Sequence, residues 1–194
     1  MTKAKFDRHE VIETSVPLFW RYGFHGTSMQ QIFAATGLQP GSVYLAFGNK
    51  TELYKEALQH YAAVSLQKNQ DVLDSAPTPE HGICNILIQM AEDAALDDFS
   101  SCFLVKSQLE LLNEQRDLHD LAINLLHRVE TLFATHLEPQ HGRELAACRA
   151  TSIMLHIFGM RVYGYHHTSK HALFEGLRQG LPWLPWPNEA HTDT

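Results

Sequence analysis

The chain has 194 residues, of which 44% are hydrophobic and 19% charged, and its net charge is −7. This length suits one ordinary globular domain or a small module joined to a larger one. An acidic total argues against a protein that coats nucleic acid over its whole surface. Because the sequence has no apolar run of about 18 residues and no secretory signal, we expect a cytoplasmic protein without a membrane partner.

The charge is unevenly distributed along the chain. Residues 1–55 hold six basic and four acidic side chains, a net charge of +2, whereas the other 139 residues hold 9 and 18, a net charge of −9. This asymmetry indicates a nucleic-acid contact confined to the N-terminal end. Cys84, Cys102 and Cys148 form neither a disulfide framework nor a CxxC zinc pair, which suits a reduced compartment.

Apolar side chains at helical spacing predict a first helix over residues 7–22, and Gly23 is expected to end it. Pro17 lies inside this helix, where it removes a backbone hydrogen bond and should kink the helix or cost about 3 kcal/mol. The helical face consists of Val11, Ser15, Leu18, Phe19 and Tyr22.

The next segment has the signals of two short helices joined by a turn. Thr27 or Ser28 is expected to cap a helix that ends at Gly37, and a glutamine three residues after the cap would close a capping box. Pro40 is well placed as the first residue of a third helix over residues 40–47. The buried residues of that third helix are Val43 and Phe47.

Helical periodicity then continues almost to the end of the chain. Asn49 is expected to cap a fourth helix, and Pro182, Pro185 and Pro187 enforce an extended tail. The later helical stretches are about 83–94, 105–112, 118–133, 143–164 and 173–181. Because no window alternates like a strand, the sequence predicts an all-α fold of about nine helices.

The second and third predicted helices match the geometry of a helix-turn-helix, in which the second member of the pair lies in the major groove of DNA. Gln39 and Ser42 can hydrogen-bond base edges, and Leu45 can contact a thymine methyl group. The candidate phosphate contacts are Tyr44, Lys50 and the backbone N–H groups beside Thr27 and Ser28. Similar helix pairs occur in proteins that do not bind DNA, so periodicity alone leaves both interpretations open.

A longer pattern runs through the same segment. The residues that carry it are Tyr22-Gly23-Phe24, Gly26-Thr27-Ser28, Ile32, Ala35, Gly37-Leu38, Gly41-Ser42-Val43-Tyr44, Phe47, Lys50 and Leu53. Without a gap, this pattern resembles the DNA-binding signature of the TetR-type (tetracycline-repressor-like) family of transcriptional regulators. Three positions depart from the family's pattern, namely Pro17, Phe33 and Ala46, which puts the operator sequence in doubt but not the class.

The resemblance implies a homodimeric regulator, usually a repressor, that binds a palindromic DNA operator and is released by a small-molecule effector. It implies phosphate contacts by Thr27, Tyr44 and Lys50, and a groove-facing surface of Gln39, Pro40, Ser42 and Leu45. Residues 1–50 would form the helix-turn-helix DNA-binding domain and residues 51–194 a helical regulatory and dimerisation bundle. We expect no cofactor and no enzymatic activity, since the sequence has no catalytic motif.

Two sets of residues are candidates for the regulatory functions. The predicted dimer interface consists of Ser152, Ile153, His156, Met160, Tyr163, Leu173 and Leu177. The predicted ligand pocket consists of Leu87, Met90, Cys102, Phe103, Leu125 and Phe133. In both cases the alternative is that the same side chains form the core of a single chain.

An alternative mode of control centres on Cys102. This residue precedes a predicted helix, and Lys106 lies one turn further on, so the helix dipole and an ammonium group would both favour the thiolate. Oxidation or alkylation of Cys102 could then replace a reversibly bound ligand, as in similar segments of some relatives that sense electrophiles or oxidants. We expect no metal site, because the pairs His167–His171 and His119–His127 lack further ligands at suitable spacing.

Overall fold

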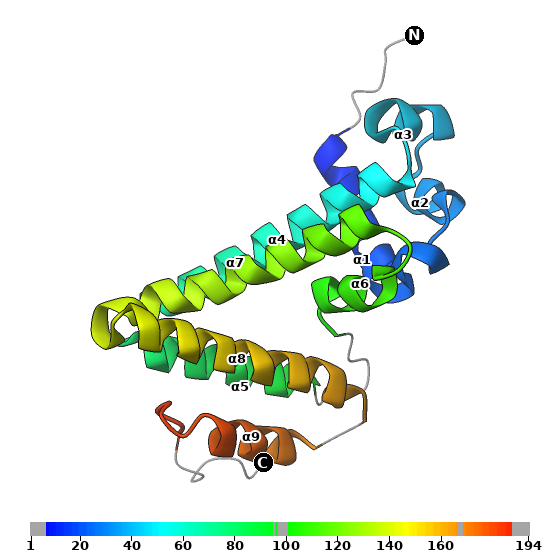
Figure 1. Ribbon diagram of the computed structural model, residues 1–194. Helices are drawn as coiled ribbons and strands as arrows, with labels where there is room; N and C mark the ends of the chain where they lie inside the picture. Colours follow the sequence, from blue (N-terminus) through cyan, green and yellow to red (C-terminus); the bar gives the residue numbers. More distant parts are fainter. Residues whose placement is uncertain (1–6, 95, 97–100, 167–168, 188–194) are drawn as a thin grey trace. The chain divides into compact units, whose positions relative to one another are not determined.

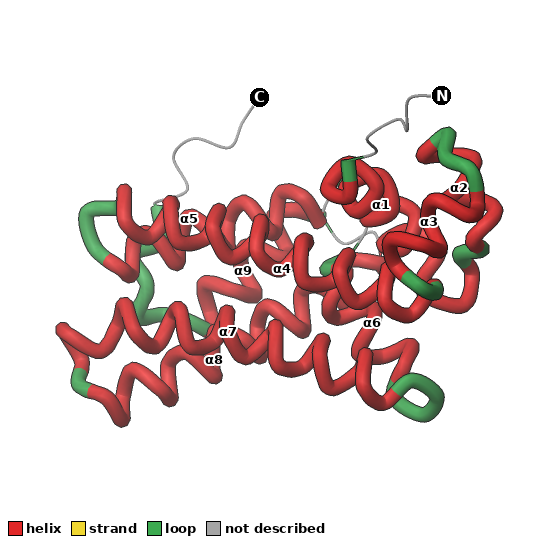
Figure 2. Tube along the Cα trace, turned by 90° about the horizontal axis from the view of Figure 1, so that it is seen from above, coloured by secondary structure: helices red, strands yellow, loops and turns green. Residues whose placement is uncertain are grey.

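The computed structural model describes residues 7–94, 96, 101–166 and 169–187. Every regular element within these residues is a helix, and short loops join the helices (Figures 1 and 2). The helices are α1 (Arg8–Gly26), α2 (Met29–Thr36), α3 (Pro40–Phe47), α4 (Lys50–Ser75), α5 (Pro79–Ala94), α6 (Phe103–Leu111), α7 (Arg116–His141), α8 (Arg143–Tyr163), η1 (Gly164–His166) and α9 (Lys170–Gly180). The predicted all-α fold is therefore confirmed.

The chain divides into two compact units. Unit 1 consists of the residues up to Ser65 together with Cys102–Leu126, and unit 2 consists of Leu66–Ser101 and the residues from His127 onward. Helices α4 and α7 contribute residues to both units. Because α6 belongs to unit 1, this grouping differs from the predicted division at residue 50, which stays a prediction.

Helix α1 is interrupted near its end, at Gly23, whose φ of 75° and ψ of −177° are not helical. The break therefore lies at the predicted terminator, and the chain resumes one further helical turn up to Gly26. Pro17 lies inside the helix and is exposed. An exposed proline is tolerated there because solvent can hydrate the carbonyl that loses its partner.

Unit 1 has an aromatic core centred on Tyr54 of α4. Its ring makes edge-to-face contacts with Phe19, Phe24 and Phe103, at centroid distances of 4.7, 5.1 and 5.4 Å. Each such pair is worth about 0.5–1.5 kcal/mol beyond the burial of its apolar area. Since Phe103 lies on α6, this core joins α6 to α1 and α4.

Unit 2 contains α5, α8 and α9, which pack against one another. The buried side chains there include Ile83 and Leu87 of α5 and Ile157 of α8. Helix α9 approaches α8 closely at Gly180, where an added Cβ would overlap the ring of His156. No helix among the described residues is both long and apolar enough to cross a lipid bilayer.

Candidate nucleic-acid interface

Helix α2 begins with a reciprocal pair of hydrogen bonds. The Ser28 hydroxyl oxygen accepts a hydrogen bond from the Gln31 backbone N–H at 3.3 Å, and the Gln31 side-chain oxygen accepts one from the Ser28 N–H at 2.7 Å. The predicted capping box is thus confirmed, with Ser28 as the cap. It fixes the start of α2, where the first N–H groups have no preceding carbonyl within the helix and can face an anion.

Helix α3 follows a turn in which Gly37 adopts the left-handed conformation, with φ of 67°. Pro40 is the first residue of the helix, as predicted, and Val43 and Phe47 are buried. Leu45 lies on the opposite side and is 83% exposed. Its side chain is therefore accessible for the thymine contact that the sequence predicts.

The other predicted base contacts, Gln39, Pro40 and Ser42, lie at the N-terminal end of α3. Gln39 and Pro40 are exposed and Ser42 is half-buried. Gln39 is the cap residue of the helix, but its side chain makes no capping hydrogen bond. These positions agree with a groove-facing role, which stays a prediction.

Tyr44 is exposed on α3, and its ring packs edge-to-face against Phe33 of α2 at a centroid distance of 5.6 Å. Phe33 is one of the positions at which the sequence departs from the family's pattern. The contact gives this departure a physical role, since the Phe33 ring limits the orientations of the Tyr44 ring. A positioned phenol can donate its hydroxyl hydrogen to a phosphate oxygen.

Thr27 is fully buried, and its hydroxyl is directed into the protein. The hydroxyl donates a hydrogen bond to the Gly23 carbonyl oxygen at 2.8 Å, and the Leu18 carbonyl oxygen lies 3.2 Å away. Any phosphate contact by Thr27 therefore has to come from its backbone. The side chain instead connects the break in α1 with the start of α2.

The Lys50 ammonium also makes hydrogen bonds within unit 1. It donates to the carbonyl oxygens of Phe24 at 2.7 Å and Thr27 at 3.0 Å, and it lies 4.3 Å from the centre of the Phe24 ring. Burial lowers the pKa of Lys50, and the charge of Glu110 opposes this shift. With two of its three hydrogens used by backbone carbonyls, Lys50 has at most one for a phosphate.

Arg8 is a supporting residue that the sequence did not reveal. Its guanidinium donates hydrogen bonds to the Glu56 carboxylate of α4 and to the Ala46 carbonyl oxygen near the end of α3. These partners are 48 and 38 residues away along the chain, so no local pattern indicates them. The contacts fix the C-terminal end of α3 against α1 and α4.

The predicted ligand-pocket residues divide between the two units. Cys102, Phe103 and Leu125 belong to unit 1, and Leu87, Met90 and Phe133 belong to unit 2. Met90 and Cys102 are half-buried, and the other four are buried. This burial is equally expected of ordinary core residues, and the ligand role of these side chains stays a prediction.

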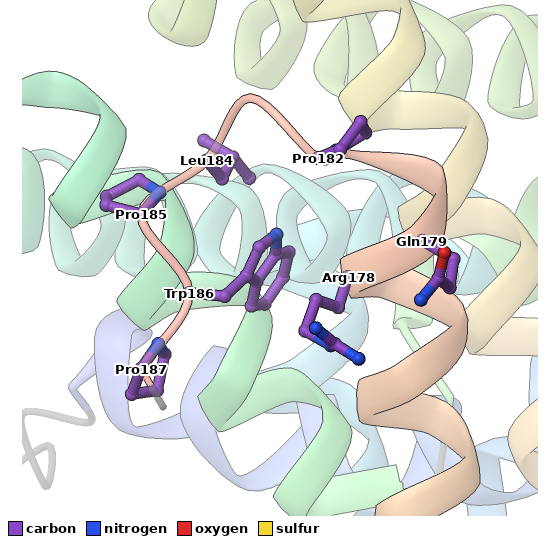
Figure 3. Close-up of a pocket in the computed structure, with 7 residues that line it drawn as sticks. All are labelled: Arg178, Gln179, Pro182, Leu184, Pro185, Trp186 and Pro187. Carbon is purple, nitrogen blue, oxygen red and sulfur yellow. The ribbon is translucent and has the colours of Figure 1, made fainter. Parts of the chain in front are cut away.

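A pocket of about 530 Å³ lies elsewhere in unit 2, beside the end of α9 (Figure 3). The residues that line it are Arg178, Gln179, Pro182, Leu184, Pro185, Trp186 and Pro187. The Arg178 guanidinium is engaged by Glu175, at 2.9 and 2.7 Å. None of the predicted ligand residues lines this pocket.

Cys102 immediately precedes α6 and is its cap residue, at the helix start that the sequence predicted. The Lys106 ammonium, however, donates hydrogen bonds to the carbonyl oxygens of Trp20 and Arg21, so its charge is directed toward α1.

The histidine pairs were the other candidates for special chemistry. One of them includes His167, which lies outside the described residues. Among the residues that are described, no group of three or more His, Cys, Asp and Glu could hold a metal ion.

The predicted dimer-interface residues differ in their exposure. Ile153, Met160, Leu173 and Leu177 are buried within the chain itself. Ser152 and His156 are half-buried, and Tyr163 is exposed. Further residues of α8 are exposed and lie along one side of the helix. We call them the α8 stripe: Cys148, Thr151, Leu155, Gly159 and Val162.

An ordered pair of short helices with an exposed second member, supported from α1 and α4, defines a helix-turn-helix protein. Residues 11–57 match the family model described as bacterial regulatory proteins, tetR family. This N-terminal segment of the chain thus belongs to the tetR family of bacterial regulatory proteins.

Individual relatives agree with this assignment. The Escherichia coli (strain K12) transcriptional repressor ComR is 34% identical over 56 residues, which cover 29% of this chain and 27% of ComR. The chain thus matches about a quarter of the length of that relative. The transcriptional repressor BdcR of the same organism is 23% identical over 143 residues, which cover 71% of this chain and 68% of BdcR.

Solved structures resemble the chain over nearly its whole length. A cysteine mutant of the TetR family transcriptional regulator CifR, in complex with 26-base-pair double-strand operator DNA, is 25% identical, with a TM-score of 0.81 and coverage of 96% of this chain and 100% of CifR. The reduced form of E. coli NemR is 19% identical, with a TM-score of 0.81 and coverage of 93% and 97%. The latter similarity shows a shared fold.

Proposed function

We propose that the chain is a homodimeric transcriptional repressor that binds a palindromic operator and is released from it by a small-molecule effector. The observation that carries the proposal is the exposed surface of α3, with Leu45 83% exposed beside Tyr44. This surface follows a capped helix α2, as a recognition helix does. The DNA-bound CifR structure supports the same role for the N-terminal helices of this chain.

The DNA-binding function is testable with duplex DNA from upstream of the protein's own gene, or with duplexes recovered by in vitro selection. We expect binding that greatly exceeds binding to a scrambled duplex of equal length at two salt concentrations. Gln39→Ala should change the preferred base at one operator position, by about 1–3 kcal/mol if the contact is bidentate. Equal losses on operator and scrambled duplexes would contradict a role of Gln39 in base recognition.

The homodimer follows from the need to hold two recognition helices at half-sites about 34–36 Å apart. We assign the α8 stripe to this interface, because Leu155 is 69% and Val162 50% exposed. Gly159 lies between them, and an added Cβ there would meet open space. Leu155→Glu should convert a dimer into a monomer in analytical ultracentrifugation. Val64→Glu, at an exposed residue of α4, is the matched control and should leave the dimer intact.

Control through Cys102 is a second candidate function. The observation that favours it is the position of this half-buried thiol directly before α6, the helix whose residues hold α1. A quinone would form a C–S bond with the thiol while the thiol proton moves to a quinone oxygen. If Cys102→Ser is still released from operator DNA by quinones, this candidate is wrong; Cys148→Ser, at an exposed cysteine, is the control.

A further inference from the structure

The break in α1 separates two particular hydrogen-bonding pairs. In an uninterrupted α-helix the N–H of residue i donates to the carbonyl of residue i−4. Phe24 would then donate to Trp20, and His25 would donate to Arg21. Because Gly23 leaves the helical conformation, these two N–H groups and two carbonyls need other partners, and leaving them unpaired inside the protein would be costly.

Helix α6 supplies all four partners from two side chains one turn apart. The Glu110 carboxylate accepts hydrogen bonds from the N–H groups of Phe24 and His25, at 3.0 and 2.9 Å. The Lys106 ammonium donates to the carbonyl oxygens of Trp20 at 2.5 Å and Arg21 at 3.4 Å. We call this arrangement the Lys106–Glu110 clamp, and it takes the place of two helical hydrogen bonds.

The glycine at the break is required by this arrangement. Its positive φ disfavours other residues, and a Cβ added there would overlap the Glu110 carboxylate. The Gly23 carbonyl also accepts a hydrogen bond from the Thr27 hydroxyl, and the Phe24 and Thr27 carbonyls accept hydrogen bonds from the Lys50 ammonium. The direction in which the chain leaves the break is therefore tied to the start of α2.

Helix α6 itself is firmly held in unit 1. The Tyr54 hydroxyl of α4 lies 2.7 Å from the Ser107 hydroxyl oxygen, and both groups are buried. Ser107 is on the turn between the two clamp residues. The clamp thus has a fixed support on one side and the interrupted end of α1 on the other.

We propose that Lys106 and Glu110 are positioning residues for operator binding, acting through the break at Gly23. With the clamp in place, α1 is broken and α2 and α3 have the orientation that fits DNA. Without it, the N–H groups of Phe24 and His25 pair again with the carbonyls of Trp20 and Arg21, α1 becomes continuous, and α2 changes direction. This inference rests on the proposed DNA-binding function.

Glu110→Gln tests the proposal, because it keeps the side-chain shape but removes the charge and one acceptor. We expect operator affinity to fall by about tenfold or more, with little change on scrambled DNA. Glu114→Gln removes an equal charge from an exposed residue, whose carboxylate lies 3.2 Å from the imidazole of His25. This control should keep operator affinity within a factor of about two of the unaltered protein.

Lys106 gives a second pair of variants, which serves also if Glu110→Gln does not fold. Lys106→Met should lose operator affinity as Glu110→Gln does, and Lys106→Arg should restore it, because a guanidinium can donate to both carbonyls. Circular dichroism and thermal unfolding of each variant establish that it is folded. Operator affinity within twofold of the unaltered protein for folded Glu110→Gln and Lys106→Met would overturn the proposal.

A spectroscopic measurement separates the clamp from the DNA-binding function. In the folded Glu110→Gln variant, the amide-proton chemical shifts of Phe24 and His25 should change, because these groups no longer donate hydrogen bonds to a carboxylate. The backbone carbon chemical shifts of residues 20–25 should move toward helical values. If these carbon shifts do not move, the clamp does not hold the break and the inference is wrong. If they move but the unaltered protein does not prefer operator DNA, the proposed function is what fails.

Discussion

The Arg8 guanidinium lies 4.2 Å from the centre of the Phe47 ring, so the first turn of α1 covers the last residue of α3. Phe47 is buried, whereas Leu45 two residues earlier is exposed. The same guanidinium bonds the Glu56 carboxylate, so α3 is held at its C-terminal end as well as by its buried face. The orientation of α3 should accordingly depend on Arg8, for which we predict no contact with DNA.

Arg8→Ala should lower the free energy of unfolding by about 1 kcal/mol, as expected for a half-exposed ion pair with a cation–π contact. It should also weaken operator binding, because α3 loses its C-terminal support. Arg8→Lys should keep only part of the stability and part of the operator affinity, because an ammonium group lacks the planar, forked arrangement of donors that a guanidinium has. Denaturant unfolding and fluorescence anisotropy measure the two effects; Arg116→Ala, at the exposed start of α7, should change neither.

Tyr54→Phe should lower the stability of the protein, whereas Tyr44→Phe should weaken its binding to DNA. Because Ser107 donates its own hydrogen to the Phe103 carbonyl, the buried Tyr54 hydroxyl donates to Ser107, and its removal should cost about 0.5–1.5 kcal/mol of stability. Burial also raises the pKa of Tyr54, which keeps the phenol neutral. Tyr44→Phe should affect stability little but weaken binding to all DNA sequences alike, with the salt dependence of binding unchanged because a phenol carries no charge.

If Tyr44→Phe binds operator and scrambled DNA as tightly as the unaltered protein does, the phosphate contact predicted for Tyr44 is wrong. Equal stability of Tyr54→Phe and the unaltered protein would show that the Tyr54–Ser107 hydrogen bond adds nothing net to the fold. Urea unfolding and anisotropy titrations on the same preparations distinguish these outcomes.

The stability of unit 2 should fall in acid because of Glu80. Burial acts to raise the pKa of Glu80, but the His141 hydrogen bond, at 2.5 Å, with further hydrogen bonds from its own backbone and Thr78, leaves that pKa lowered. A lowered folded-state pKa means that the unfolded chain binds more protons in this range. The contribution of the Glu80 carboxylate to stability is complete above the ordinary pKa of 4.5, and it disappears as the pH falls through the pKa of the folded state.

Glu80→Gln should therefore be less stable than the unaltered protein near neutral pH and nearly equal to it at about pH 3. Urea unfolding across this range measures the difference, and Glu138→Gln at an exposed site of α7 is the control. A difference that stays constant with pH would show that the ionised carboxylate is not the source of the stability.

Two glycines with positive φ give a matched test of the α1 break. Gly23→Ala brings both an unfavourable φ and overlap with Glu110, whereas Gly37→Ala brings only the unfavourable φ, since nothing lies within 4 Å of an added Cβ there. We expect Gly37→Ala to cost about 1–2 kcal/mol and Gly23→Ala to cost more. Equal losses in thermal unfolding would show that the Glu110 carboxylate moves aside freely.

Local signals explain why the helix-turn-helix was predictable from the sequence. Ser28, Gly37 and Pro40 each act on neighbouring backbone groups, and in the structure α2 and α3 begin and end at the predicted residues. Gly23 was predicted only as a terminator. In the structure Gly23 interrupts α1, and one more helical turn follows it. This arrangement depends on Glu110, which is 86 residues from Phe24 along the chain and contributes no local pattern.

The dimer interface shows a different limit of sequence patterns. Helical periodicity identifies Ile153 and Met160 as residues that avoid water, and both are buried within one chain. The same periodicity does not distinguish a core within a chain from a core formed by two chains. Exposed Leu155 and Val162 become apparent only when the rest of the chain is in place.

The three tryptophans of the chain are distributed so that each unit carries its own fluorescent reporter. Trp20 packs against Tyr61 in unit 1, at 5.2 Å between ring centroids. In unit 2, Trp183 lies under the Arg149 guanidinium, and the Trp186 indole donates to the Leu181 carbonyl at 2.8 Å. A Trp20→Phe protein would emit from unit 2 alone, and subtraction would resolve how the helix-turn-helix end melts without any attached dye.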